Sequence, residues 1–202
     1  MNQFKIRASA AGKIMTNPRS KSELISETAI SYVHDWLKES IYGVKKDFTS
    51  KYTEKGTLLE DEGIDKAITW LDLPLVLKNE KRIEDEYFTG SPDLILEDEI
   101  IDIKLSWDAF TFPLFEDELP EKDYFYQVQI YMHLTGKKKA RVVFLLLNTP
   151  EEIAKWETHH DYSDVPIDKR WKAYPVEYDP VVIADLKTRV GNIREYIKTI
   201  KI

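Results

Sequence analysis

The chain has 202 residues, a net charge of −7 and no cysteine. This length suits one domain with a substantial core, so we expect residues 1–202 to form a single domain. The lack of cysteine excludes disulfides, thiolate zinc sites, a cysteine nucleophile and a cysteine-ligated iron–sulfur cluster. The first five residues, MNQFK, contain no apolar signal core. No apolar run approaches the roughly 18 residues of a membrane span. We therefore expect a cytoplasmic protein with no membrane partner.

The negative net charge argues against a nucleic-acid partner, because proteins that bind phosphates usually carry a basic surface. However, acidic residues that hold metal ions would themselves lower the net charge. A single basic groove is also enough to follow a DNA backbone. The charge therefore leaves a nucleic-acid partner possible.

The first part of the chain is predicted to be helical. A short helix covers Ser9–Met15 and stops before an Asn-Pro pair, because a residue before proline disfavours the helical conformation. Ser22 is the expected N-cap of a long amphipathic helix that ends at Gly43. A second helical stripe runs over Leu58–Leu71 and ends near Pro74.

The pattern then changes to short β-rich runs and a last pair of helices. The expected strands are Leu75–Leu77, Tyr87–Thr89, Asp93–Leu96, Ile100–Leu105, a buried Val142–Leu147 and an edge strand Lys172–Tyr178, with a hairpin turn at Glu97-Asp98-Glu99. The expected helices are Tyr124–Leu134, ended by Gly136, and a final helix from Asp179-Pro180 toward Ile200. This order predicts an α/β (α+β) fold with a central mixed β-sheet flanked by helices.

The segment most informative about chemistry is Gly90-Ser91-Pro92-Asp93, followed after eight residues by Asp102-Ile103-Lys104. Residues two apart in a strand point to the same side, so the side chains of Asp102 and Lys104 should project together. The hairpin should bring Asp93 beside them. The sequence therefore predicts two carboxylates and one ammonium at one spot.

This trio suits the hydrolysis of a phosphodiester. Mg²⁺, or Mn²⁺ in its place, prefers hard oxygen ligands and keeps several waters. Such an ion polarises a phosphoryl oxygen and lowers the pKa of bound water. The carbonyl of Ile103 could supply one more ligand. Lys104 would position or help to deprotonate the attacking water and offset charge in the transition state.

Each of these residues also has a simpler interpretation. Asp93 could cap a turn, and Asp102 with Lys104 could be an exposed strand edge, which is the better interpretation of an isolated D-x-K. Glu60 could face the site from a helix or belong to a solvated acidic face. Gln127 and Tyr131 share one helix face at i and i+4, as an ordinary surface pair also would.

The order of the motifs favours the functional interpretation. The set G-x-x-x-E, G-x-x-D, (D/E)-x-K and Q-x-x-x-Y is present as Gly56…Glu60, Gly90…Asp93, Asp102…Lys104 and Gln127…Tyr131. It resembles the pattern of RecB-like nucleases in the PD-(D/E)XK superfamily, which share a restriction-endonuclease-like core. From Arg7 to about Thr135 the chain looks most like the family of lambda exonuclease and the YqaJ viral recombinases.

The resemblance implies a Mg²⁺- or Mn²⁺-dependent exonuclease that degrades one strand of duplex DNA from 5′ to 3′, starting at DNA ends. It implies that Asp93 and Asp102 hold the metal with the Ile103 carbonyl, and that Glu60 assists. Lys104 would serve the nucleophile, and Gln127 would orient Lys104 or the nucleophile. Such proteins often assemble as ring-shaped trimers and work with a phage single-strand annealing protein.

The resemblance also implies DNA contacts outside the metal site. Ser9 and Ser91 fall where the family binds the 5′-phosphate of the DNA end. The family's phosphate-binding arginine would fall at Asn2, where Arg7 or Lys5 would have to replace it. The remaining expected DNA contacts are Tyr124, Tyr131, and Lys45, Lys46 and Lys51. These lysines belong to a basic stretch that extends to Lys55 and in which lysines alternate with aromatic residues.

Two other interpretations stay open. One is a RecB/Cas4-like nuclease domain that acts on single-stranded DNA in a larger complex, although the lack of cysteine disfavours the iron–sulfur type. The other is a non-catalytic DNA-binding module of the same fold. The pair His159-His160 is a weak metal-site candidate, because adjacent histidines rarely converge on one ion.

Overall fold

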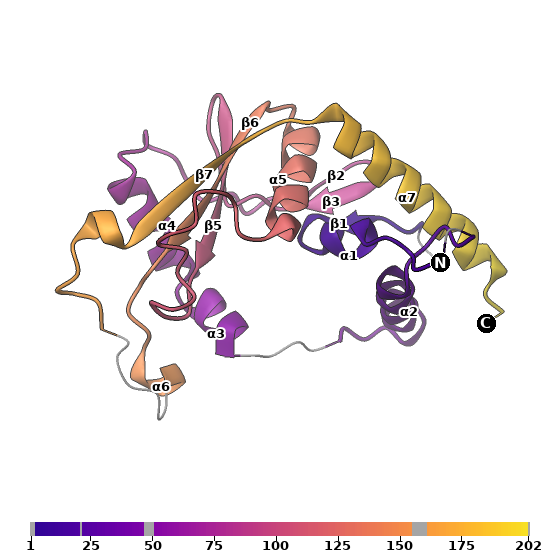
Figure 1. Cartoon of the computed structure of the whole chain (residues 1–202), viewed down its shortest axis with the longest axis horizontal. Helices are drawn as coiled ribbons and strands as arrows, with labels where there is room; N and C mark the ends of the chain where they lie inside the picture. The colour runs from indigo at the N-terminus through magenta and orange to yellow at the C-terminus, as the bar shows by residue number, and fades with distance from the viewer. Residues whose placement is uncertain (1–2, 21, 47–50, 155–160, 202) are drawn as a thin grey trace.

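A computed structural model describes residues 3–20, 22–46, 51–154 and 161–201 (Figure 1). The helices are α1 (Ala11–Met15), α2 (Glu27–Tyr42), α3 (Lys51–Leu58), α4 (Glu60–Trp70), α5 (Lys122–Thr135), α6 (Glu151–Ala154) and α7 (Pro180–Thr199), with 3₁₀ turns η1 (Ala8–Ala10) and η2 (Ile167–Lys169). The strands are β1 (Ile6–Arg7), β2 (Ile83–Glu84), β3 (Phe88–Gly90), β4 (Leu94–Ile95), β5 (Glu99–Leu105), β6 (Lys139–Leu145) and β7 (Trp171–Glu177).

The strands form two mixed sheets. In the smaller sheet the order is β1-β3-β2, with β1 parallel and β2 antiparallel to β3. In the larger sheet the order is β4-β5-β6-β7, with β5 and β6 parallel and the outer pairs antiparallel. The predicted mixed α/β architecture is thus confirmed, although the expected central sheet is divided between β3 and β4.

Both faces of β5 are covered, and its residues alternate between two hydrophobic clusters. Ile100 packs into the cluster that includes residues of α5, whereas Ile101 packs into the cluster built on α4. Figure 1 shows α5 and α4 on opposite sides of the β5–β6 pair. Because side chains alternate along a strand, Asp102 and Lys104 share the α5 side with Ile100. The sheet therefore aims both residues at α5.

Two predicted helix boundaries differ from the structure. The N-cap of α2 is Ser26 and not Ser22, because the Ser26 hydroxyl accepts a 3.1 Å hydrogen bond from the Ala29 amide. Ser26 is also buried, so this cap is part of the packed structure. The second helical stripe is broken at Leu59 into α3 and α4, since Leu59 leaves the helical conformation that a single helix would need.

The predicted strand at Leu75–Leu77 is wrong. The structure has no strand there, and the side chains of Leu75 and Leu77 are 98% and 84% exposed. A β-rich composition forms a strand only when a neighbouring strand supplies hydrogen-bond partners and a face to bury. This segment has neither.

The predicted hairpin turn, two predicted helix ends and the predicted edge strand are confirmed. The acidic hairpin closes with a bond from the Leu96 amide to the Glu99 carbonyl. Gly136 ends α5 with a φ of +75°, which glycine adopts without strain. Asp179 caps α7 by accepting from the Val181 amide at 2.8 Å. The predicted edge strand is β7.

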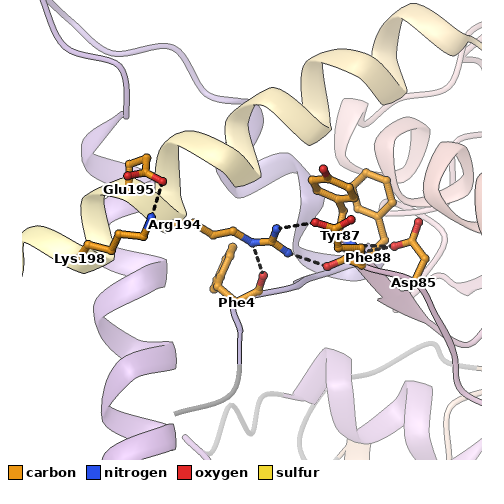
Figure 2. A network of polar contacts seen from close by, with 8 residues as sticks. Phe4, Asp85, Tyr87, Phe88, Arg194, Glu195 and Lys198 are labelled. Atoms are coloured by element: carbon orange, nitrogen blue, oxygen red, sulfur yellow. Dashed lines mark hydrogen bonds and ion pairs between the residues drawn. The ribbon is translucent and has the colours of Figure 1, made fainter.

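The long C-terminal helix ties the beginning of the chain to the smaller sheet (Figure 2). Arg194 of α7 donates to the carbonyl oxygens of Phe4, at 3.1 Å, and Glu86, at 2.6 Å. Its guanidinium also lies 5.0 Å from the ring centre of Tyr87. These contacts hold β1 beside β3, next to the turn that leads to Asp93.

Among the described residues, no helix is both long and apolar enough to cross a membrane.

Candidate active site

Asp93 reaches the edge of β5 that β4 leaves free. The β4–β5 ladder pairs Leu94 with Ile101 and does not extend to Ile103. The Ile103 amide instead donates a 2.6 Å hydrogen bond to the Asp93 carboxylate. In a strand the amide and carbonyl of one residue point to the same edge. The Ile103 carbonyl therefore also points to the side where Asp93 lies.

Asp102 and Lys104 form a buried ion pair on the α5 side of β5. The Lys104 ammonium lies 2.8 Å from Asp102 Oδ2, and the two side chains are 20% and 2% exposed. The ammonium also lies 4.7 Å from the ring centre of Tyr124. Apart from this ion pair, the buried Asp102 Oδ2 has no partner within the described part of the chain.

Gln127 connects these groups through one amide. Its nitrogen donates to Asp102 Oδ1 at 3.1 Å and to the Tyr131 hydroxyl at 2.9 Å. Its oxygen accepts from the Lys104 ammonium at 3.2 Å. A neutral group on α5 thus fixes the orientation of the Asp102 carboxylate and that of the Lys104 ammonium.

Burial and neighbouring charges shift the pKa values of Asp93 and Lys104. Burial, together with the negative charge of Asp102, raises the pKa of Asp93 to about 7, against the opposing effects of the Ile103 amide and of Lys104. Burial lowers the pKa of Lys104, but its charge interaction and hydrogen bond with Asp102 outweigh this and leave the pKa raised. The pKa values of both groups are therefore raised, that of Asp93 by burial and repulsion and that of Lys104 by attraction to Asp102.

The geometry fits a divalent cation at Asp93 and Asp102. Burial and the negative charge of Asp102 raise the pKa of Asp93, and a cation would offset both effects. Asp102 Oδ2 is buried with only the Lys104 ammonium near it, so this carboxylate oxygen can also serve as a metal ligand. The Ile103 carbonyl adds an oxygen at the same edge. The described residues hold no group of three histidine, aspartate or glutamate side chains that could bind a metal by themselves. Waters and a substrate phosphate would have to complete the shell, as Mg²⁺ usually requires.

Glu60 does not join this cluster by a hydrogen bond or an ion pair in the described structure. It is the first residue of α4, which packs on the other face of β5. Its carboxylate is half exposed and lies 2.9 Å from the Lys78 ammonium. Its charge nevertheless contributes to raising the pKa of Asp93, so it lies close enough to influence the site.

The two predicted phosphate-binding serines flank a close contact between chain segments. Ser9 in η1 and Ser91 after β3 are both exposed. Between them, a Cβ on Gly90 would lie 3.0 Å from the Ala8 Cβ and 2.5 Å from the Tyr131 ring. Glycine at this position lets η1, β3 and α5 meet. The nearby Arg7 is exposed and donates to the Tyr32 hydroxyl at 3.4 Å.

The basic stretch is divided by the fold. Lys45 is exposed beyond the end of α2. Lys46 is paired with Asp35 at 2.6 Å. The side chain of Lys51 lies outside the described residues, as do Phe48 and His159-His160. Of the three predicted lysines, the structure therefore describes the side chains of Lys45 and Lys46 alone, the second of them paired with an acidic residue.

One residue that supports the site, Asn79, was not predicted from the sequence. Asn79 donates from its backbone to the Asp93 carbonyl at 2.8 Å and from its side chain to the Pro92 carbonyl at 2.9 Å. The neighbouring Lys78 holds Glu60. No motif marked these residues, because their role depends on a segment that only the fold brings beside Asp93.

Comparison with known proteins identifies solved structures with the same fold. No protein-family model matches the sequence, and no curated protein does. The structure matches an alkaline exonuclease from Laribacter hongkongensis, which has also been solved in complex with dAMP. The TM-score is 0.70 and the identity 20%, over 96% of this chain and 91% of the other. This likeness shows a shared fold. It matches a phage-related exonuclease from Haemophilus somnus 129PT with a TM-score of 0.87, 30% identity and coverage of 96% and 94%. With this identity over nearly the whole of both chains, the protein belongs to the family of that phage-related exonuclease.

Proposed function

We propose that this protein is a metal-dependent DNA exonuclease that degrades duplex DNA from its ends in the 5′ to 3′ direction. The observation that carries the proposal is the convergence of three charged groups on β5: Gln127 joins Asp102 to Lys104, and the Ile103 amide between them holds Asp93. Membership of a phage-related exonuclease family supports the reaction class. Polarity and the duplex substrate follow from the sequence resemblance.

Each residue of the site would have a separate role in the reaction. Asp93, Asp102 and the Ile103 carbonyl would hold Mg²⁺ or Mn²⁺, which supplies Lewis-acid polarisation of the phosphoryl oxygen and acidifies water. Lys104 is kept protonated by Asp102, so it acts as a donor to the attacking water or to a phosphoryl oxygen and not as a base. Gln127 fixes the ammonium in place.

The DNA contacts are also part of the proposal. We assign the 5′-phosphate to Ser9 and Ser91, with Arg7 in place of the missing arginine, and a nearby base to Tyr124. Tyr131, the other predicted contact, is buried and accepts a hydrogen bond from Gln127, so it is not available to DNA. Gly90 packs against both Ala8 and the Tyr131 ring, and Tyr131 accepts a hydrogen bond from Gln127, which links the phosphate region to the trio. A homo-oligomeric ring and a single-strand annealing protein as partner belong to the same proposal.

The test is digestion of 5′-phosphorylated linear duplex with Mg²⁺, compared with EDTA, with single strands and with closed circles. Linear duplex alone should be degraded, and only with the metal. Single strands degraded in preference would favour the RecB-like interpretation. Specific DNA binding without cleavage under any metal would favour the non-catalytic module.

A further inference from the structure

Lys55 of α3 is a buried cation outside the trio. Its side chain is 1% exposed, and its ammonium donates to the carbonyl oxygens of Ser106, Trp107 and Leu147 at 2.8, 2.8 and 2.9 Å. An ammonium has three N–H donors, so each one is used. The negative charge of Asp108 favours the protonated form of Lys55. Such full satisfaction is what allows a charge to remain in an apolar interior.

These three carbonyls lie just beyond the ends of two central strands. Ser106 and Trp107 continue β5 directly after Lys104-Leu105, and Leu147 continues β6. Figure 1 shows α3 at this end of β5. One side chain thus links a short helix to the strand that carries Asp102 and Lys104.

The same helix leads into Glu60. The Lys55 carbonyl accepts from the Leu59 amide at 3.0 Å, Leu59 is buried, and the next residue is Glu60. The position of Lys55 therefore sets where Glu60 stands. Glu60 is linked to the Asp93 segment through the pair Lys78-Asn79, because the Lys78 ammonium lies 2.9 Å from Glu60 and the Asn79 amide donates to the Asp93 carbonyl at 2.8 Å. The connection runs from β5, through Lys55 and α3, to a carboxylate beside the site.

We propose that Lys55 is a positioning residue for the active site, whose ammonium fixes α3 to the ends of β5 and β6 and thereby places Glu60 beside Asp93. The inference rests on the proposed nuclease function and on a part for Glu60 in it. A lysine suits this role because an apolar side chain of similar length would fill the volume but remove a hydrogen-bond donor from each of three buried carbonyls.

A double-mutant cycle with Lys55→Gln and Glu60→Gln tests this placement. We expect each single variant to lower kcat on linear duplex by at least about 10-fold, and the double variant to be no worse than Glu60→Gln within about 2-fold, because residues that act as one unit are not additive. Effects that multiply, or a Lys55→Gln variant with unchanged kcat, would overturn the proposal.

The matched control is Thr149→Val. Thr149 donates to the same Trp107 carbonyl at 3.2 Å but does not belong to α3. This variant should keep kcat within about 2-fold of the wild type, since the cited bond is not part of the link to Glu60. A loss equal to that of Lys55→Gln would mean that the Trp107 carbonyl, and not α3, is what matters.

A second readout does not depend on cleavage. Amide hydrogen exchange in residues 53–60 should be faster in Lys55→Gln than in the wild type and unchanged in Thr149→Val. Unchanged exchange in both variants would overturn the proposal even if activity fell. If the wild type does not cleave DNA, the proposed function fails, while the exchange result still decides whether Lys55 fixes α3. Should Lys55→Gln not fold, Lys55→Arg replaces it, because arginine keeps the charge but not the compact three-donor head.

Discussion

Lys104 and Gln127 meet through a 3.2 Å hydrogen bond in which the ammonium donates to the amide oxygen. The same amide donates through its nitrogen to Asp102, the ion-pair partner of Lys104. A neutral side chain on α5 thus fixes both charges of a pair on β5. The trio can keep its geometry before any ligand arrives, and the predictions below depend on this arrangement.

Asp93→Asn should abolish cleavage while leaving the fold intact, because it removes one carboxylate but almost no volume. We expect kcat to fall at least about 100-fold, and calorimetry should show the loss of Mg²⁺ or Mn²⁺ binding. The control is Asp98→Asn in the exposed hairpin turn, which should behave as the wild type. Residual activity of Asp93→Asn within a few-fold of the wild type would refute the site assignment.

Lys104→Ala should bind DNA nearly as well as the wild type but lose turnover, because the ammonium acts on the reacting groups. Fluorescence anisotropy gives the Kd for a short duplex, and single-turnover digestion gives the rate. Lys66→Ala is the control, since Lys66 lies on α4, which packs on the face of β5 opposite Lys104. If turnover survives and only affinity falls, Lys104 is a phosphate contact.

Gly90→Ala and Gly191→Ala should change stability in opposite directions. A Cβ on Gly90 would lie 2.5 Å from the Tyr131 ring, so we expect a loss of about 2 kcal/mol in the free energy of unfolding. At Gly191, inside α7, a Cβ would meet no atom within 4 Å, and alanine should add up to about 1 kcal/mol. Urea denaturation measures both. Equal effects would mean that the close contact at Gly90 is absent.

Stability should depend on pH through Lys55. Burial lowers the pKa of its ammonium from 10.5 to about 8, with Asp108 opposing. Between these values the unfolded chain holds a proton that the folded protein has released, so the contribution of Lys55 to stability is complete above pH 10.5 and is lost as the pH falls to 8. The free energy of unfolding of the wild type, minus that of Lys55→Gln, should therefore rise with pH over this window, by at most about 1.4 kcal/mol per unit. A flat difference would contradict the lowered pKa.

The protein should be a homo-oligomer, with a ring trimer as the expected form, and should digest long duplex processively. An acidic chain has little electrostatic hold on DNA, so enclosure would keep it on its substrate. Light scattering should give about three times the 23.7 kDa mass of one chain, and digestion should continue after excess competitor DNA is added. A monomer that stops at once would refute the ring and leave the nuclease assignment in place.

The sequence by itself determined the features that depend on short spacing. The two-residue repeat of a strand placed Asp102 and Lys104 on one side, and the acidic turn returned Asp93 to the same edge. Gly136 and Asp179 marked helix ends through local backbone chemistry. These signals act over a few residues, so no distant segment could cancel them.

Only the tertiary structure decided what distant segments do to each other. Lys55 belongs to a basic stretch in the sequence, yet its three acceptors lie 51, 52 and 92 residues away along the chain. Glu60 fits a motif, but packing of α4 on the opposite face of β5 gives it Lys78 as its partner. Burial and partner choice depend on which surfaces meet, and periodicity along one chain carries no information about that.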